Sequence, residues 1–166
     1  MPLHYVAVAG PGDGASSDAI GDATAVGRLL AERGWVMLCG GRNAGVMAAA
    51  AAGASAAGGL TIGILPGSER TEAAPELTVA LATGLGEARN AVLVSAANAV
   101  IACGLNPGTL SEIGLALRAS KPTALVRPSV ETVKLLAEIV GGASLYIAAT
   151  AEDAVAWVGR QLSSEA

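Results

Sequence analysis

The chain has 166 residues, which is enough for one domain with a substantial core and too few for two. It is 52% hydrophobic but only 2% aromatic, with 22 glycines and no phenylalanine, so small side chains must fill the core. The formal net charge of −4 and the scattered basic residues argue against a protein that binds polymeric nucleic acid.

Apolar runs of strand length alternate with helical stretches along the whole chain. We predict strands over 4–9, 35–39, 60–65, 77–83, 99–103, 123–126 and 145–148, and helices over 17–33, 44–57, 87–97, 110–119, 130–139 and 151–162. Several strands are continuously apolar, which is typical of parallel strands covered on both faces. The sequence therefore predicts a single α/β domain over 1–166, Rossmann-like and doubly wound, whose mostly parallel sheet carries helices on both faces.

The segment between Arg42 and Glu69 contains no charged residue and is mostly alanine and glycine. Alanine contributes little to membrane insertion, and Gly58 and Gly59 interrupt the run. We therefore predict a helix of small residues and a buried strand there, with no membrane partner. No signal peptide is evident, so we expect a cytoplasmic protein.

Two cysteines, Cys39 and Cys103, each end an apolar run just before a glycine. Two cysteines are too few for a disulfide framework, and no histidine accompanies them in a motif. We predict that both are small core residues, and we assign no metal ligands.

Three predicted strands end in glycine-rich loops, at 10–14, 40–45 and 104–109, and each loop leads into a helix. In a doubly wound sheet, ligands bind beyond the carboxyl ends of the strands, near the point where the strand order reverses. Backbone N–H groups and positive helix termini converge there, as an anionic phosphate requires. We predict a site for a small phosphorylated ligand, with these candidate binding residues in the loops: Gly10, Gly40, Gly41, Gly45, Gly108 and Thr109.

Two common nucleotide sites fit the loops poorly. The first loop nearly matches a dinucleotide fingerprint, with small residues at Gly10, Gly12 and Ala15. The second predicted strand ends at Cys39, however, without the acidic residue that would hold a ribose. A Walker loop is absent, since no Gly-Lys-Ser/Thr occurs.

Several residues near the loops have both a structural and a functional interpretation. Arg42 faces either a phosphate or water, and Arg89 is either a solvated helix residue or a ligand contact. Thr109-x-x-Glu112 matches a capping box with Thr109 at the N-cap, but Glu112 in the first helical turn would also face the ligand site.

Three motifs follow one another in order: Gly40-Gly41-x-x-x-Gly45-Val46-Met47, Gly86-Glu87-Ala88-Arg89-Asn90 and Gly108-Thr109-x-x-Glu112. They resemble the motifs of the Lonely Guy-like superfamily, which includes cytokinin-activating nucleotide phosphoribohydrolases, proteins labelled "possible lysine decarboxylase" and molybdenum cofactor carrier proteins. The residues of these motifs are most similar to those of the carrier branch and its uncharacterised bacterial relatives. The resemblance implies a Rossmann-like fold and a homo-oligomer, either a homodimer or a dimer of dimers.

The resemblance also implies roles for single residues. Gly108 and Thr109 would bind phosphate, and Asn90 is a further candidate ligand-binding residue. Arg89 and Glu112 match the catalytic pair of the hydrolase branch, in which a carboxylate stabilises the positive charge that develops on the sugar. This chain departs from the hydrolase pattern at five positions, which are Arg42, Glu87, Asn90, Leu105 and Asn106.

Our leading hypothesis is a carrier-like protein that binds a nucleotide or a phosphorylated cofactor, either AMP-like or molybdopterin-type. The alternative is a nucleoside 5′-monophosphate phosphoribohydrolase, so enzymatic activity stays open. A second alternative is a degenerate site with a structural or interaction role. A lysine decarboxylase is excluded, because no lysine lies in a motif suited to pyridoxal phosphate.

Overall fold

The computed structural model describes residues 3–140 and 145–164. Its strands are β1 (Tyr5–Ala9), β2 (Val36–Cys39), β3 (Thr61–Leu65), β4 (Val79–Ala82), β5 (Ala99–Cys103), β6 (Thr123–Val126) and β7 (Leu145–Ala148). Its helices are α1 (Ser17–Glu32), α2 (Gly45–Ala56), α3 (Arg89–Ala96), α4 (Pro107–Arg118), α5 (Val130–Ile139) and α6 (Ala151–Ser164), with a short 3₁₀ helix η1 (Gly86–Ala88) before α3. Strands and helices alternate except where β4 follows β3 directly, as the sequence predicts.

The strands form one seven-stranded sheet in the order β4-β3-β2-β1-β5-β6-β7. Every neighbouring pair is parallel. The order reverses at β1, which pairs with β2 on one side and with β5 on the other. The predicted doubly wound sheet is therefore confirmed, and its switch point lies between β1 and β5.

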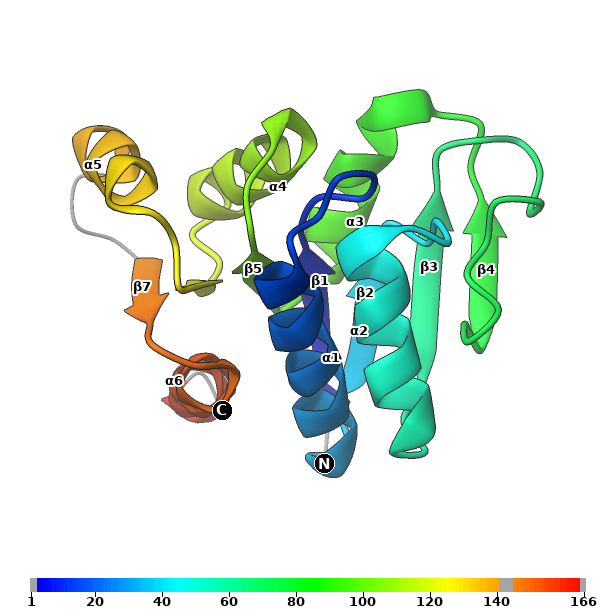
Figure 1. The fold of residues 1–166 in the computed structure, drawn as a ribbon, viewed down its shortest axis with the longest axis horizontal. Coiled ribbons are helices and arrows are strands. Elements are labelled where there is room, and N and C mark those ends of the chain that lie inside the picture. Colours follow the sequence, from blue (N-terminus) through cyan, green and yellow to red (C-terminus); the bar gives the residue numbers. More distant parts are fainter. Residues whose placement is uncertain (1–2, 141–144, 165–166) are drawn as a thin grey trace.

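Helices cover both faces of the sheet (Figure 1). Alternate residues of β1 face opposite layers: Val6 and Val8 pack with α1, α2 and α6, whereas Ala7 and Ala9 pack with α3, α4 and α5. This division follows from the period of two in a strand, and it explains why β1 is apolar at nearly every position. Among the described residues, no helix is long and apolar enough to cross a membrane.

Helices α1 and α2 approach each other backbone to backbone. A Cβ added to Gly27 would lie 2.1 Å from the carbonyl oxygen of Ala50, and one added to Gly53 would lie 2.1 Å from that of Thr24. No side chain fits between these backbones. The alanine- and glycine-rich composition thus serves a close helix contact as well as the loops.

We expect Gly27→Ala to lower the free energy of unfolding by about 1–3 kcal/mol, because the added methyl overlaps a backbone carbonyl that cannot move aside easily. Gly21→Ala on the same helix is the matched control. No heavy atom lies within 4 Å of its added Cβ, so this change should raise the free energy of unfolding by about 0.5–1 kcal/mol through helix propensity. Urea unfolding of both variants checks the pair, and equal effects would contradict the close contact.

Candidate functional site

A cavity of about 290 Å³ opens at the carboxyl ends of the central strands, beside the switch point. It is lined by residues from the end of β1, the loops after β1, β2 and β5, the 3₁₀ helix η1, and the starts of α2, α3 and α4. They are Val8, Ala9, Gly10, Gly12, Arg42, Met47, Glu87, Arg89, Asn90, Asn106, Gly108, Thr109 and Glu112. Segments far apart in the sequence thus meet where the sequence predicts a ligand site.

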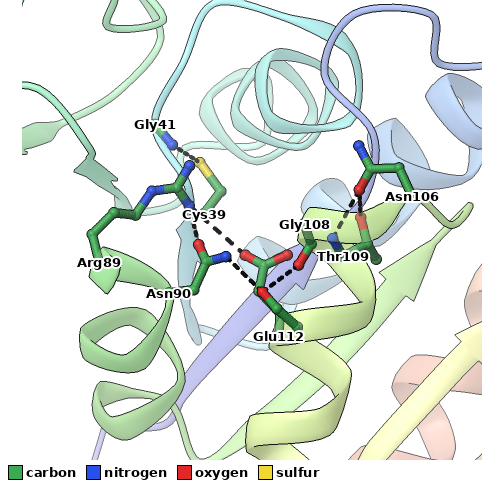
Figure 2. A network of polar contacts seen from close by, with 9 residues as sticks. Cys39, Gly41, Arg89, Asn90, Asn106, Gly108, Thr109 and Glu112 are labelled. Carbon is green, nitrogen blue, oxygen red and sulfur yellow. Dashed lines mark hydrogen bonds and ion pairs between the residues drawn. The ribbon is translucent and has the colours of Figure 1, made fainter. Parts of the chain in front are cut away.

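Arg89 and Glu112 enter the cavity from two helices of the same layer, α3 and α4 (Figure 2). Each is only 6% exposed. Arg89 Nη1 donates a hydrogen bond to Asn90 Oδ1 at 2.8 Å and lies 3.8 Å from Glu112 Oε1. Asn90 Nδ2 in turn donates to Ser111 Oγ at 2.9 Å, and Ser111 Oγ donates to the Gly108 carbonyl at 2.7 Å. This network fixes the starts of α3 and α4 relative to each other.

Burial raises the pKa of the Glu112 carboxyl from 4.5 to about 7, an effect that Arg89 opposes and Glu87 strengthens. The separation of 3.8 Å from Arg89 is too long for a hydrogen bond. Within the described residues the Glu112 carboxylate forms no hydrogen bond, and the buried Nε of Arg89 has no partner. Glu112 therefore faces the cavity ready to donate or accept a hydrogen bond near neutral pH.

The start of α4 differs from the sequence prediction, and the capping-box interpretation is wrong. Asn106 is the N-cap, and its Oδ1 accepts hydrogen bonds from the Thr109 N–H at 2.8 Å and from Thr109 Oγ1 at 2.9 Å. Pro107 follows in the first helical turn, so Asn-Pro was the start signal that could have been recognised. Glu112 does not bond to the N-cap residue, and its side chain lines the cavity instead.

This capping also affects the expected phosphate contacts. Both Thr109 donors already bond to Asn106. Phosphate binding by Gly108 and Thr109 stays a prediction, and a ligand that used Thr109 would have to displace the Asn106 side chain.

The remaining predicted glycines separate into two groups. Gly10 lines the cavity, whereas Gly40, Gly41 and Gly45 are not among its lining residues. A Cβ on Gly40 would lie 2.5 Å from Arg89 Nη1, and one on Gly45 would lie 2.1 Å from the Gly12 carbonyl oxygen. These two glycines make room for Arg89 and for the first loop, and direct ligand contact by Gly40, Gly41 and Gly45 stays a prediction.

Seven lining residues were not among the predicted binding residues: Val8, Ala9, Gly12, Arg42, Met47, Glu87 and Asn106. Gly12 and Arg42 could have been predicted, because both lie in a loop that directly follows a predicted strand. Met47 and Glu87 belong to motifs that the resemblance contains, but nothing in the sequence shows that their side chains face the cavity.

Both cysteines are core residues, as predicted, and neither is exposed at all. Burial raises the pKa of the Cys39 thiol to about 11 and that of the Cys103 thiol to about 12. The Gly41 N–H donates to Cys39 Sγ at 3.4 Å, which holds the turn after β2 beneath the cavity. Neither thiol is a nucleophile at neutral pH.

Comparisons with known proteins identify a family for this chain and several proteins of similar fold. The profile of the SLOG cluster4 family matches residues 3–155. The chain is similar to the molybdenum cofactor binding protein from Rippkaea orientalis, at 39% identity over 98% of this chain and 99% of that chain, with a TM-score of 0.94. It is also similar to the molybdenum cofactor carrier protein of Chlamydomonas reinhardtii, at 36% identity over 98% of this chain and 99% of that chain, with a TM-score of 0.91.

A third relative is an uncharacterised protein from Archaeoglobus fulgidus. It is 38% identical over 130 residues, which make up 78% of this chain and 84% of that protein.

We expect Glu112→Gln to change the pH dependence of stability. The folded pKa of about 7 exceeds the ordinary 4.5, so between these values the folded protein binds a proton that the unfolded chain releases. The contribution of this group is therefore complete below pH 4.5 and lost as the pH rises through 7. A shift of this size corresponds to about 3 kcal/mol.

Glutamine cannot ionise, so the unfolding free energy of the variant relative to wild type should rise by about 3 kcal/mol between acidic and mildly alkaline pH. Urea unfolding across this range measures the difference. Glu69→Gln, at an exposed position, is the matched control. A difference that does not vary with pH would show that folding does not raise the pKa of Glu112.

Proposed function

This chain belongs to the SLOG cluster4 family, and we propose that it carries a small phosphorylated ligand of the molybdenum cofactor type in the cavity at its switch point. The proposal depends above all on one observation, the composition of that cavity. Its lining includes Gly10, Gly12 and Gly108, and its side chains offer both hydrogen-bond donors and acceptors. Two similar proteins are named for binding or carrying this cofactor.

The polar groups of the cavity suit a ligand with both N–H groups and anionic oxygens, as a pterin phosphate has. Glu112 and Glu87 supply carboxylate acceptors, while Arg89 and Arg42 supply guanidinium donors. The Glu112 carboxylate is buried without a hydrogen bond among the described residues, so a ligand N–H or O–H would satisfy it. The donor and acceptor set therefore fits such a cargo.

The size and shape of the site also suit a carrier. Its volume of about 290 Å³ lies just below the range of about 300–1,000 Å³ that is typical of small-molecule pockets. None of the described lining residues is aromatic, so the heterocycle is held by polar contacts and not by ring stacking. Binding without stacking and without a covalent bond allows the cargo to be released to an acceptor protein.

A nucleotide phosphoribohydrolase is the second candidate, and the Arg89–Glu112 pair favours it. In that reaction water adds to C1′ of the ribose, the C1′–N bond breaks, and the proton ends on the released base. An ionised Glu112 would take the proton from water and stabilise the sugar cation. The bonds from Thr109 to Asn106 speak against it, since that phosphate contact is already occupied.

The carrier proposal predicts that the purified protein binds molybdenum cofactor released anaerobically from a molybdoenzyme. Molybdenum content and pterin fluorescence after rapid desalting measure the bound cofactor. Gly108→Val should weaken binding about tenfold, roughly 1.4 kcal/mol, because the side chain would fill the cavity wall. Gly114→Val on the same helix is the matched control, since nothing lies within 4 Å of its added Cβ. Failure of the wild type to retain cofactor would overturn the proposal.

We expect no release of free base when the protein is incubated with AMP and related nucleoside monophosphates. Chromatography of the reaction mixture detects free adenine directly. Release by the wild type that disappears in Glu112→Gln, with the fold intact, would establish the hydrolase instead.

A further inference from the structure

The main chain around Arg42 is fixed to the connection between β3 and β4. The Asn43 N–H donates to the Glu72 carbonyl at 2.8 Å, and the Ala74 N–H donates to the Gly41 carbonyl at 2.9 Å. Arg42 and Ala73 thereby form an isolated antiparallel bridge. The main chain of Arg42 is therefore held in place, and its side chain lines the cavity from there.

The side chain itself is held loosely. Its Nη2 lies 3.6 Å from Asp13 Oδ2 and its Nε lies 3.8 Å from Glu72 Oε2, distances that exceed a hydrogen bond. The Asp13 and Glu72 side chains are 85% and 60% exposed, so water screens both pairs. No hydrogen bond from the Arg42 guanidinium occurs within the described residues, and its fork of donors is available.

The other cationic group of the cavity is partly engaged by neighbouring side chains. Arg89 is buried, bonds to Asn90 and lies beside the Glu112 carboxylate. Glu87 and Glu112 also offset the two arginines in formal charge when both are ionised. An incoming anionic group therefore finds its free guanidinium at Arg42.

We propose that Arg42 binds the anionic group of the ligand, and that this group displaces Asp13 and Glu72 from the guanidinium. A guanidinium binds phosphate-type oxygens through two parallel N–H bonds, which are stronger than screened pairs at 3.6 and 3.8 Å. The inference rests on the proposed carrier function, and it names the residue that orients the cargo.

This assignment determines how the ligand lies. The Arg42 guanidinium lies next to Gly12, with Nη1 3.8 Å from the position of an added Cβ. The anionic group is then held at the loops after β1 and β2, and the remainder of the ligand points inward to Arg89 and Glu112. Thr109 is not needed for phosphate, in agreement with its bonds to Asn106.

The test measures equilibrium binding of released molybdenum cofactor to the full chain, with inorganic phosphate as a competitor. Arg42→Ala should weaken binding about tenfold and reduce competition by phosphate, with Arg42→Lys intermediate because lysine keeps the charge but not the fork. Arg70→Ala, which removes a positive charge from the same connection outside the cavity lining, is the matched control and should bind like the wild type.

A second experiment changes the two acidic neighbours of Arg42, which are Asp13 and Glu72. Asp13→Asn combined with Glu72→Gln frees Arg42 and should tighten binding about two- to fivefold, the range expected from losing exposed ion pairs. The same double change should have no effect in an Arg42→Ala background. This arm leaves Arg42 in place, and both replacements keep the main-chain bonds of the connection.

The outcomes separate the two proposals. Wild-type binding with an unchanged Arg42→Ala variant would overturn the role of Arg42 and leave the carrier function standing. If Arg70→Ala weakens ligand binding as much as Arg42→Ala does, the effect is one of general charge. The same holds if the double change of Asp13 and Glu72 tightens binding equally with and without Arg42. Either result would overturn the proposal that the ligand displaces these two carboxylates from Arg42. A wild type that binds no cofactor would overturn both proposals together.

Discussion

The parallel pairing of β1 with β2 on one side and β5 on the other is the constraint on which the rest of the structure depends. Because the chain leaves β1 and β5 toward opposite faces of the sheet, the two following loops diverge at the carboxyl edge. The space between them cannot be filled by either connection. Every part of the candidate site, from the glycine loops to the starts of α3 and α4, is arranged around that space.

The site carries groups that the fold would be more stable without. Glu112 and Arg89 are buried at a separation that leaves the carboxylate without a hydrogen bond and one guanidinium nitrogen without a partner. Small residues on the opposite layer, such as Gly27 and Gly53, allow the close helix contacts that stabilise the fold elsewhere. The molecule thus separates a tightly packed, apolar layer from a polar cavity with unsatisfied hydrogen-bonding groups.

Much of the fold was predictable from the sequence, for a local reason. Continuous apolar runs such as 99–103 and 123–126 coincide with β5 and β6, because burial on both faces leaves a pattern that needs no knowledge of the partner strands. The place of the site followed from glycines at strand ends. The wrong N-cap of α4 arose because Thr-x-x-Glu and Asn-Pro-x-Thr are both valid start signals, and only the folded chain selects between them.

The sequence by itself determined the alternation of strands and helices, the small-residue packing and the convergence of three motifs at one edge of the sheet. Only the tertiary structure decided what surrounds each polar side chain. The sequence leaves open whether Arg89 is solvated or contacts a ligand. In the folded protein, residues distant in sequence bury it and bring Glu112 within 3.8 Å. The pKa of Glu112 and the weak hold on Arg42 depend on desolvation and on distances between separate loops, and neither quantity is encoded in a local pattern.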